Sequence, residues 1–364
     1  MLSKKLLLMV TAGLAVILFS VSSHSSPADT QGAAALTGQV SSAEEGPMEG
    51  VLVSAKKTGA TIRITVVSDR QGRYSFPAAK LEPGHYSLTI RAAGYDLDGT
   101  GSADIAGGKA ATADLKLKKA KNLSAQLSNA EWMMSLPGSD DQKRPLLDCV
   151  GCHTAQRIVK STHDADEFMQ VFDRMSGYYN GASPLHPQRL IGGARNPVGH
   201  TPEMMARAKY LSGINLSEAS SFEYPLKTLP RPTGRATHVV ITEYDLLRPD
   251  TQPHDVIVEP DGMVWYSDFG RQFLGRLDPK TGKVTEFAVP ELKKGFPVGT
   301  LELEPDKEGT LWLSLMYHGG IARFDKKSET FKIYAVPRSC HGYNFRQVLG
   351  YIGELGISFI YGGK

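Results

Sequence analysis

Two of the three cysteines in this 364-residue chain lie three positions apart and are followed at once by a histidine, in Cys149-Val150-Gly151-Cys152-His153. On one helical turn, this spacing lets both thiols reach the vinyl groups of a single haem, while the adjacent imidazole lies over the iron. Three cysteines cannot build a disulfide framework, so the pair must serve local chemistry. We therefore predict one covalent haem c, attached by Cys149 and Cys152, with His153 as its proximal iron ligand.

Two other interpretations of the cysteine pair remain open. A thioredoxin-type redox pair has the same spacing, but no βαβ pattern surrounds it here. A zinc site would need further ligands, and the other cysteine, Cys340, lies far away in the sequence. Cys340 is expected to be a thiol without an assigned role.

The N-terminus has the pattern of an export signal. Lys4 and Lys5 precede the apolar run 6–19, and small residues follow as far as Ser26. Residues 1–26 are therefore predicted to be a signal peptide; a membrane anchor is the alternative, although the run is shorter than the roughly 20 residues a spanning helix needs. We expect a periplasmic or secreted protein with no membrane attachment after cleavage. In that oxidising compartment a thiol pair has to be capped, as thioether bonds to haem would do.

The overall charge excludes some classes of protein. The sequence has 41 Lys and Arg against 38 Asp and Glu, which gives a net charge of +3. This excess of positive charge is too small for a protein whose main function is to bind nucleic acid. With 41% hydrophobic and 22% charged residues, neither wholesale disorder nor a multi-span membrane protein is expected.

Residues 33–121 alternate apolar and polar positions between turn residues, as in 62–66, which predicts short β-strands. The pattern Asp69-x-x-Gly72-x-Tyr74-x-Phe76, with Pro83-Gly84-x-Tyr86 and Ala93-Gly94-Tyr95, resembles the carboxypeptidase regulatory-like domain, a prealbumin-like β-sandwich. The resemblance implies an accessory module that sometimes meets carbohydrate or another domain, with no catalytic residues. Its strand aromatics Tyr74, Phe76, Tyr86 and Tyr95 are expected to pack in the core; a sugar-stacking face is the alternative.

Residues 129–220 surround the cysteine pair with helix patterns. Phe168, Phe172 and Met175 recur at helical spacing, and Thr201-Pro202-Glu203 is a typical helix start. This segment resembles an all-α class I cytochrome c domain, which implies a methionine opposite His153 as the second iron ligand.

The identity of that second ligand is open. Arg174-Met175 matches the placement found in short cytochromes, so we predict Met175, with His153, as the metal ligands. The alternatives are a methionine of the last helix, Met204 or Met205, or one of the histidines His163, His186 and His200. A site without a second protein ligand is the remaining alternative. Two occupied axial positions favour electron transfer over oxygen chemistry.

The segment 235–337 repeats itself. Asp261–Asp268 returns as Glu308–Leu315, and Asp278 and Asp325 lie 47 residues apart in equivalent contexts. The stretch 241–244 likewise returns as 284–287. A period in the forties with several short strands indicates β-propeller blades.

The repeat resembles the virginiamycin B lyase (streptogramin lyase) propeller, through its Pro-His strand and its Pro-Asp-Gly-x-x-Trp and Thr-Gly-x-x-Thr-Glu elements. The resemblance implies an active-site histidine on the Pro-His strand, with acidic and histidine partners on neighbouring blades and a magnesium ion. His254 and Asp268 match one blade, but Pro297-Val298-Gly299 lacks the histidine and Leu315 replaces the acid. We therefore expect no lyase activity, and His254 to be a turn residue that caps a blade loop.

The segment from Arg235 to the last residue is too short to form three blades at the observed repeat length, whereas a closed propeller needs at least four blades. We expect an incomplete, apparently truncated propeller followed by an irregular tail, 338–364. A fragment or an altered reading frame would explain this; a partner that supplies blades is the alternative.

Together these patterns predict a multidomain chain: β-sandwich, class I cytochrome c and partial β-propeller. The expected function is periplasmic electron transfer by a haem-binding protein with a redox partner protein. The alternatives are a haem-coupled oxidoreductase or lyase-like propeller enzyme, and a module that binds carbohydrate or protein.

Overall fold

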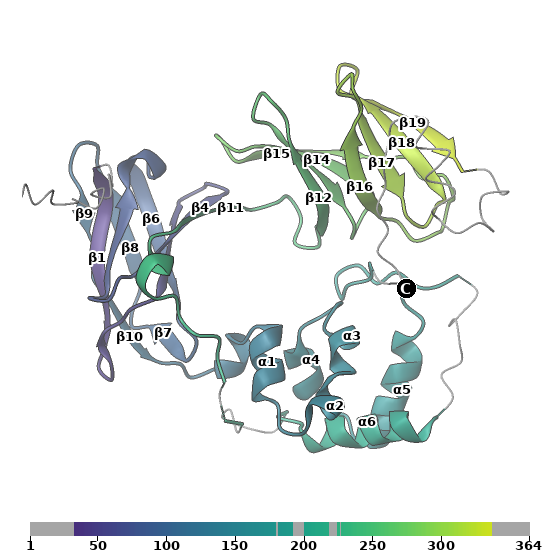
Figure 1. Ribbon diagram of the computed structural model, residues 1–364, viewed down its shortest axis with the longest axis horizontal. Coiled ribbons are helices and arrows are strands. Elements are labelled where there is room, and N and C mark those ends of the chain that lie inside the picture. The colour runs from purple at the N-terminus through teal and green to yellow at the C-terminus, as the bar shows by residue number, and fades with distance from the viewer. Residues whose placement is uncertain (1–32, 180, 192–199, 218–223, 226, 337–364) are drawn as a thin grey trace, which may run out of the picture.

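The structure is a computed structural model that describes residues 33–179, 181–191, 200–217, 224–225 and 227–336. Figure 1 shows three parts: an N-terminal sandwich, a group of helices, and two sheets near the other end of the chain. The predicted signal peptide 1–26, the tail 338–364 and Cys340 lie outside the described residues. Within the described part, no helix is long and apolar enough to cross a membrane.

The sandwich is built from two sheets. One has the order β2-β1-β10-β7, with β5 and β9 also paired to β1, and the other has the order β11-β4-β3-β6-β8, in which β11 is Val240–Tyr244. Their strands are β1 (Ala34–Ser42), β2 (Gly46–Pro47), β3 (Leu52–Lys57), β4 (Ile62–Val67), β5 (Arg73–Pro77), β6 (Gly84–Arg91), β7 (Tyr95–Leu97), β8 (Gly101–Ile105), β9 (Ala111–Thr112) and β10 (Leu115–Lys119). The predicted sandwich is confirmed.

The strand aromatics fill the sandwich core. Tyr74, Phe76, Tyr86 and Tyr95 are all buried in one apolar cluster. The rings of Tyr74 and Phe76 meet edge to face with centroids 5.8 Å apart, a favoured aromatic geometry. The expectation of core packing is confirmed, and these rings present no face on which a sugar could stack.

The helices follow the sandwich, and all except α2 contribute residues to one core. They are α1 (Asn129–Ser135), α2 (Asp140–Lys143), α3 (Leu146–Cys149), α4 (Ala155–Val159), α5 (Ala165–Met175) and α6 (Pro202–Gly213). Trp132, Leu146, Phe168 and Leu211 are among the buried residues that unite them. The predicted helix starts are present: Asp164 and Glu167 form a capping box on α5, and the Thr201 side chain caps α6. The assignment of this helical unit to class I cytochrome c stays a prediction.

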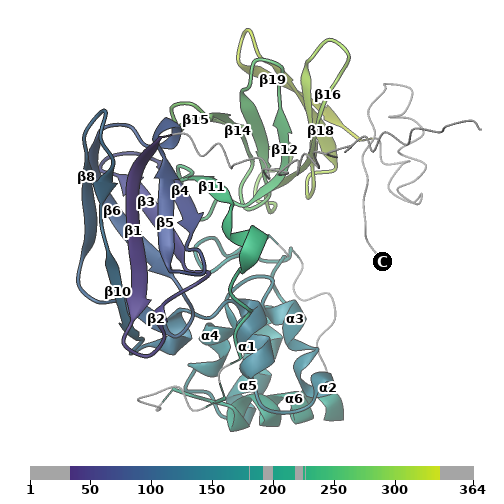
Figure 2. The ribbon, with the colours of Figure 1, turned by 60° about the vertical axis from the view of Figure 1, so that its left-hand side comes forward.

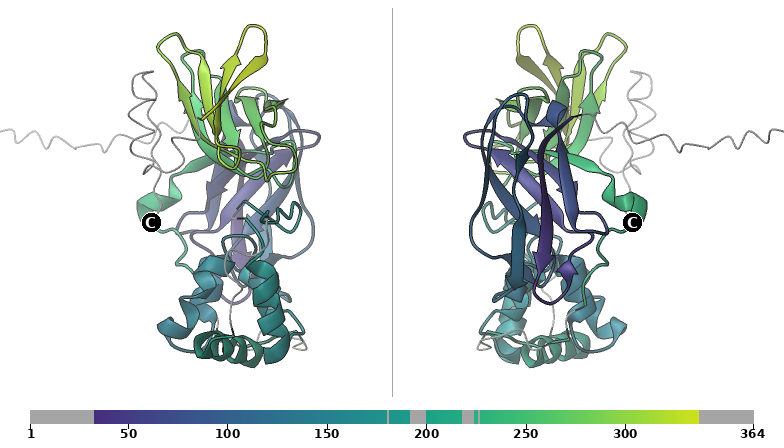
Figure 3. Two further views of the ribbon diagram at one scale, coloured as in Figure 1. Left: turned by 90° about the vertical axis from the view of Figure 1, so that its right-hand side faces the viewer. Right: turned by 90° about the vertical axis from the view of Figure 1, so that its left-hand side faces the viewer.

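Two four-stranded antiparallel sheets follow, and in the view of Figure 3 they stand above the helices. We name the first blade 1: β12 (Pro253–Val258), β13 (Val264–Asp268), β14 (Phe273–Asp278) and β15 (Lys283–Ala288). Blade 2 comprises β16 (Thr300–Pro305), β17 (Leu311–Leu315), β18 (Gly320–Asp325) and β19 (Thr330–Ala335). Across the described residues these blades do not close into a ring.

The sequence repeat has a structural basis in equivalent contacts. The Trp265 indole donates to Glu259 at 2.8 Å, and the equivalent Trp312 indole donates to Asp306 at 2.9 Å. Between the blades, the Phe324 ring packs against those of Trp265 and Phe287, with centroids 5.7 and 4.9 Å apart. The blades are thus joined face to face by an apolar core.

Strand β11 (Val240–Tyr244) lies where the sequence repeat did not predict it. Its similarity to 284–287 predicted a blade strand, but it pairs antiparallel with β4 of the sandwich, as the adjacent labels in Figure 2 indicate. The Lys56–Asp245 ion pair and a 3.3 Å hydrogen bond from Thr65 to Glu243 support this pairing. The physical reason is that β11 satisfies the backbone groups at the open edge of β4.

Gly275 provides a test of blade 1 packing. A Cβ atom there would lie 1.9 Å from the Tyr266 ring. Tyr266 on β13 is the cross-strand neighbour of Gly275 on β14, and its ring lies over the glycine. Gly275→Ala should lower the free energy of unfolding by about 1–3 kcal/mol, because the ring has to move. Thermal and urea unfolding would measure the loss. Gly213→Ala, where no atom lies within 4 Å, is the matched control and should be nearly neutral; equal effects of the two substitutions would contradict the packing argument.

Candidate functional site

The Cys-x-x-Cys-His motif lies in the turn between α3 and α4. Cys149 is the last residue of α3, and the Val150 amide closes that helix on the Leu146 carbonyl at 3.0 Å. The Cys152 amide then reaches the Cys149 carbonyl at 3.5 Å. The motif therefore forms a compact turn of the backbone.

Asn129 fixes this turn from both sides. Its side-chain amide donates to the Val150 carbonyl at 3.2 Å, and its carbonyl oxygen accepts from the Ala155 amide at 3.0 Å. Because Asn129 is the first residue of α1, these two bonds tie the start of that helix to the motif. The turn is thus held by tertiary contacts as well as by its own backbone.

The two cysteines are thiols rather than a disulfide. Burial raises the pKa of the Cys149 thiol, against an opposing effect of the Arg207 charge, and burial also raises the pKa of the Cys152 thiol. A thioredoxin-type pair needs an attacking thiol with a lowered pKa, the opposite direction. Nor do three His, Cys, Asp or Glu side chains converge on a metal site anywhere in the described residues. The raised thiol pKa values thus do not favour the redox-pair interpretation.

His153 contacts the neighbouring backbone through one ring nitrogen. Its Nδ1 atom lies 3.2 Å from the Thr154 carbonyl oxygen, which suits a protonated Nδ1 that donates to this oxygen. Metal-binding histidines commonly use one ring nitrogen in this way, so that the other is left to bind the metal. The residues of the motif therefore fit a covalently attached haem.

The methionine candidates differ in their surroundings. Met175 ends α5 and is 39% exposed, whereas the apolar stripe before it is buried at Phe168. Met204 is partly buried and packs against the same core as Cys149. Met205, one position further on α6, is 58% exposed. The choice of Met175 stays a prediction, with Met204 as the candidate that shares a core with the motif.

Each histidine candidate has another partner. His163 lies 3.5 Å from Glu167, and His200 lies 3.5 Å from Asp173. His186 contacts the Gly270 carbonyl of blade 1 at 2.9 Å. These contacts occupy one ring nitrogen of each residue.

The loop after α5 joins the helical unit to both blades. The buried Gln188 accepts from the Val298 amide at 2.7 Å and donates to the Val298 carbonyl at 3.0 Å. The Gly181 amide donates to the Tyr317 hydroxyl of blade 2 at 3.2 Å. With the His186–Gly270 contact, these bonds dock the segment that follows α5 onto the blade loops. Sequence reasoning did not find this contact, because nothing local in the loop specifies its partner.

The two lyase-like positions have structural roles. His254 lies in β12, not in a turn as expected, and its Nδ1 is 2.9 Å from the Asp255 carboxylate. Asp268 is fully buried: one oxygen accepts from the Gln252 and Gly270 amides at 2.9 and 3.0 Å, and the other pairs with Arg248. Its oxygens are therefore committed to holding blade 1 together.

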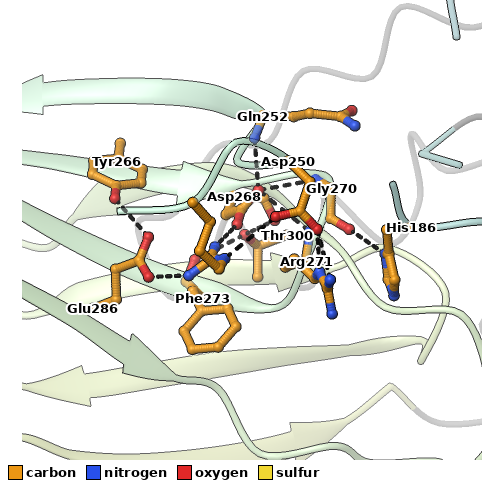
Figure 4. A network of polar contacts seen from close by, with 11 residues as sticks. His186, Asp250, Gln252, Tyr266, Asp268, Gly270, Arg271, Phe273, Glu286 and Thr300 are labelled. Atoms are coloured by element: carbon orange, nitrogen blue, oxygen red, sulfur yellow. Dashed lines mark hydrogen bonds and ion pairs between the residues drawn. The ribbon is translucent and has the colours of Figure 1, made fainter. Parts of the chain in front are cut away.

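Figure 4 shows a cluster of charged residues around Asp268. Arg248 bridges Asp268 and Glu286 and lies over the Phe273 ring, 4.2 Å from its centroid. The Tyr266 hydroxyl donates to Glu286 at 2.9 Å. We call these residues, Arg248, Tyr266, Asp268 and Glu286, the Arg248 cluster.

Asp250 lies at the edge of this cluster. Burial alone would raise the pKa of Asp250, but a 2.7 Å hydrogen bond and the charge of Arg271, aided by Arg248, hold that pKa below its ordinary value. A buried carboxylate kept ionised by arginines stabilises a fold only while the pairing persists.

The Arg248 cluster was missed from the sequence, although a signal was available. The repeat places Leu313, Leu315 and Ile333 where blade 1 has Tyr266, Asp268 and Glu286. Polar residues at these positions of blade 1, where blade 2 has apolar residues, indicate that the two blades use these positions differently.

The described residues define a β-rich chain of several parts: a prealbumin-like sandwich, a helical unit with a Cys-x-x-Cys-His turn, and two blade-like sheets. Residues 35–118 match the carboxypeptidase regulatory-like domain, so the resemblance is confirmed for the N-terminal part. No curated protein matches the chain.

Three solved structures illustrate what parts of the chain are similar to. A catalytically inactive virginiamycin B lyase from Staphylococcus aureus with quinupristin is 22% identical over 29% of this chain and 33% of that chain, with a TM-score of 0.25. A streptogramin B lyase is 20% identical over 28% and 31%, with a TM-score of 0.24. A 5-hydroxyisourate hydrolase from Klebsiella pneumoniae is 22% identical over 24% and 99%, with a TM-score of 0.18. The chain thus spans about a third of the lyases' length, and these partial similarities carry no functional argument.

Asn129 is predicted to hold the motif turn. In Asn129→Ala, the Ala155 amide loses its acceptor, so its hydrogen exchange should become about fivefold faster, the equivalent of about 1 kcal/mol. Asn129→Asp is the matched control: it keeps an acceptor for Ala155 and loses the donor to Val150. Exchange at Ala155 should therefore stay close to wild type in Asn129→Asp, and an unchanged rate in Asn129→Ala would contradict the role of this side chain.

Arg271 is predicted to stabilise blade 1 in a pH-dependent manner. Arg271→Gln should lower the free energy of unfolding at pH 7 by about 1.5–3 kcal/mol, because Asp250 loses a charged partner. A carboxyl group with a lowered pKa stabilises the fold above its ordinary value of 3.8 and loses that contribution below it. The difference between wild type and variant should therefore shrink as the pH falls below 3.8. Urea unfolding from pH 7 to 3 would test this, with the surface pair variant Lys118→Gln as the control; a constant difference would refute it.

Proposed function

We propose that this chain is an exported electron-transfer protein that carries one covalent haem c. The observation that carries the proposal is the Cys-x-x-Cys-His turn: two thiols in a turn that the Asn129 hydrogen bonds hold in place, followed by an imidazole whose Nδ1 lies 3.2 Å from the Thr154 carbonyl oxygen. These are the residue types that haem attachment needs.

Each residue of the turn has a role in this proposal. Cys149 and Cys152 would form the thioether bonds, and His153 would bind the iron through Nε2. Met175 or Met204 would supply the second axial ligand, in the manner of a class I cytochrome c. Bound by these residues, the haem would supply a one-electron redox couple.

Export and a redox partner belong to the same proposal. Haem attachment through thioethers is suited to an oxidising compartment, where an unprotected thiol pair would oxidise. The residue pattern of 1–26 supports a periplasmic or secreted location, and a redox protein of that compartment would be the electron donor or acceptor.

A second candidate is a haem-coupled oxidoreductase. It is favoured by the loop after α5, which ties the helical unit to Gly270 of blade 1 and to Val298 and Tyr317 of blade 2. Such docking would keep a haem at a fixed position relative to a substrate bound at the blade loops. Lyase chemistry has no comparable support, because Asp268 is enclosed by its own partners.

The test is a pyridine haemochrome spectrum of the full chain, matured in a periplasm that attaches haem c. We expect one haem per chain that remains with the denatured protein, and its loss in Cys149→Ala/Cys152→Ala. Protein without retained haem would refute the cytochrome proposal. In Met175→Ala and Met204→Ala, loss of the weak long-wavelength sulfur–iron band would identify the axial methionine.

Redox titration separates the two candidates. An electron carrier should be reduced and reoxidised by small mediators and partner proteins without consuming a substrate. Turnover-linked haem reduction, lost when Gln188→Ala releases the blade loops, would favour the oxidoreductase instead.

A further inference from the structure

His318 is a fully buried histidine in the turn between β17 and β18. Its Nδ1 atom accepts a hydrogen bond from the Leu292 amide at 3.1 Å. A ring nitrogen that accepts carries no proton, so the imidazole is neutral and its proton lies on Nε2. Nε2 has no hydrogen-bond partner among the described residues. The contact with Leu292 therefore requires the neutral form of the ring.

Leu292 belongs to the segment 289–299, which joins β15 of blade 1 to β16 of blade 2 and which we call the blade linker. The Leu292 side chain lies over Gly320 at the start of β18, where an added Cβ atom would approach it to 2.9 Å. The Met316 amide donates to the Gly299 carbonyl at 3.2 Å. The blade linker and the turn 315–320 thus form one packed unit, and the His318–Leu292 hydrogen bond lies within it.

Both halves of this unit hold the loop that follows α5. In the blade linker, Val298 exchanges two hydrogen bonds with Gln188, at 2.7 and 3.0 Å. In the turn, the Tyr317 hydroxyl accepts from the Gly181 amide at 3.2 Å, and its ring meets that of Tyr179 with centroids 4.5 Å apart. A change that separates the blade linker from the turn therefore also loosens the docking of the helical unit onto the blades.

The repeat places a cation at the equivalent position of blade 1. Arg271 and His318 each lie two residues before the third strand of their blade. Arg271 pairs with the buried carboxylate of Asp250, three residues before β12, whereas the residue three positions before β16 is Pro297. Blade 1 thus provides a counterion for a charge at this position, and blade 2 has no carboxylate at the equivalent place. A charged His318 would lack the partner that Arg271 has.

The surroundings of the ring set the direction of its titration. Burial lowers the pKa of His318 below its ordinary value of 6.5, and the Lys293 ammonium adds to this effect. The Glu291 carboxylate and the carbonyl groups of Pro297 and Phe296 oppose it without overcoming it. A histidine with a lowered pKa contributes its full stabilisation above pH 6.5, and that contribution is lost progressively as the pH falls below this value.

We propose that His318 is a pH-sensitive switch: in mildly acidic conditions its protonation breaks the hydrogen bond with Leu292, opens the blade linker and releases the loop after α5 from the blades. A proton on Nδ1 would point at the Leu292 N–H group, so two donors would face each other in a buried site. The switch does not depend on haem, because every contact in it lies outside the cysteine motif.

His186 is the other histidine of this docking contact, and its response to acid is different. Its Nδ1 lies 2.9 Å from the Gly270 carbonyl oxygen. A protonated His186 has a hydrogen on Nδ1 and can still donate to this oxygen. Its titration therefore preserves its contact, whereas that of His318 breaks one.

The test is hydrogen exchange of the full chain between pH 7.5 and pH 5, expressed as protection relative to the unfolded chain. For the amides of Leu292, Val298 and Gly181, we expect protection to fall by up to about tenfold per pH unit below 6.5. The amides of β4 in the sandwich should keep their protection, which would show that the opening is local. In His318→Asn, an amide oxygen replaces Nδ1 as the acceptor and does not titrate, so protection should no longer depend on pH.

Two variants of the blade linker test the same titration without removing the ring. Glu291→Gln removes a charge that favours the protonated ring and should move the opening to lower pH, whereas Lys293→Gln should move it to higher pH. These variants decide the matter if His318→Asn does not fold, and His85→Gln on the exposed surface of the sandwich is the control that should change nothing. Constant protection in wild type down to pH 5, an acid-induced loss that persists in folded His318→Asn, or failure of the two linker variants to shift the opening in opposite directions would overturn the proposal.

Discussion

A β-sheet has two faces and two edges, and each must be paired, covered or made polar before the sheet is stable in water. This constraint governs most of the structure. The sandwich buries two sheet faces against one another around Phe76 and Tyr86. β11 covers the edge of β4. The blades bury one face of each against the other, and the Arg248 cluster closes the remaining face of blade 1. The faces and edges of the sheets are thus covered in three ways: by apolar packing, by backbone pairing and by ion pairing.

Local patterns predicted local structure well. Alternation in 62–66 specified β4, and Thr201-Pro202 specified the start of α6, because strand period and helix capping depend on neighbours in sequence. The repeat likewise predicted the blade strands. It failed at β11, whose sequence resembles β15 but whose partner is β4. A strand's own residues set its period, whereas its pairing partner depends on which sheet edge is open nearby, and a single sequence does not contain that information.

The Arg248 cluster illustrates a second limit. Arg248 lies in the segment between β11 and β12, and no spacing rule of the sequence connects it to Asp268 or Glu286. Only the fold brings the three charges together. Asp268 matched a lyase position in sequence, yet its burial and its backbone partners give it a structural role. A residue type at the right position is therefore weaker grounds for catalysis than an oxygen that is accessible to substrate.

The cysteine motif is the opposite case, because its chemistry is almost wholly local. Five consecutive residues place two thiols and an imidazole in one turn, and contacts such as that of Asn129 only hold the turn in place. The second axial ligand is not local: Met175 and Met204 come from different helices, and their places depend on how α5 and α6 pack. The proposed attachment of haem therefore rests on sequence spacing, whereas the proposed second ligand depends on the tertiary fold. The thioether residues are thus proposed from the sequence, and the choice between Met175 and Met204 requires the spectrum of the loaded protein.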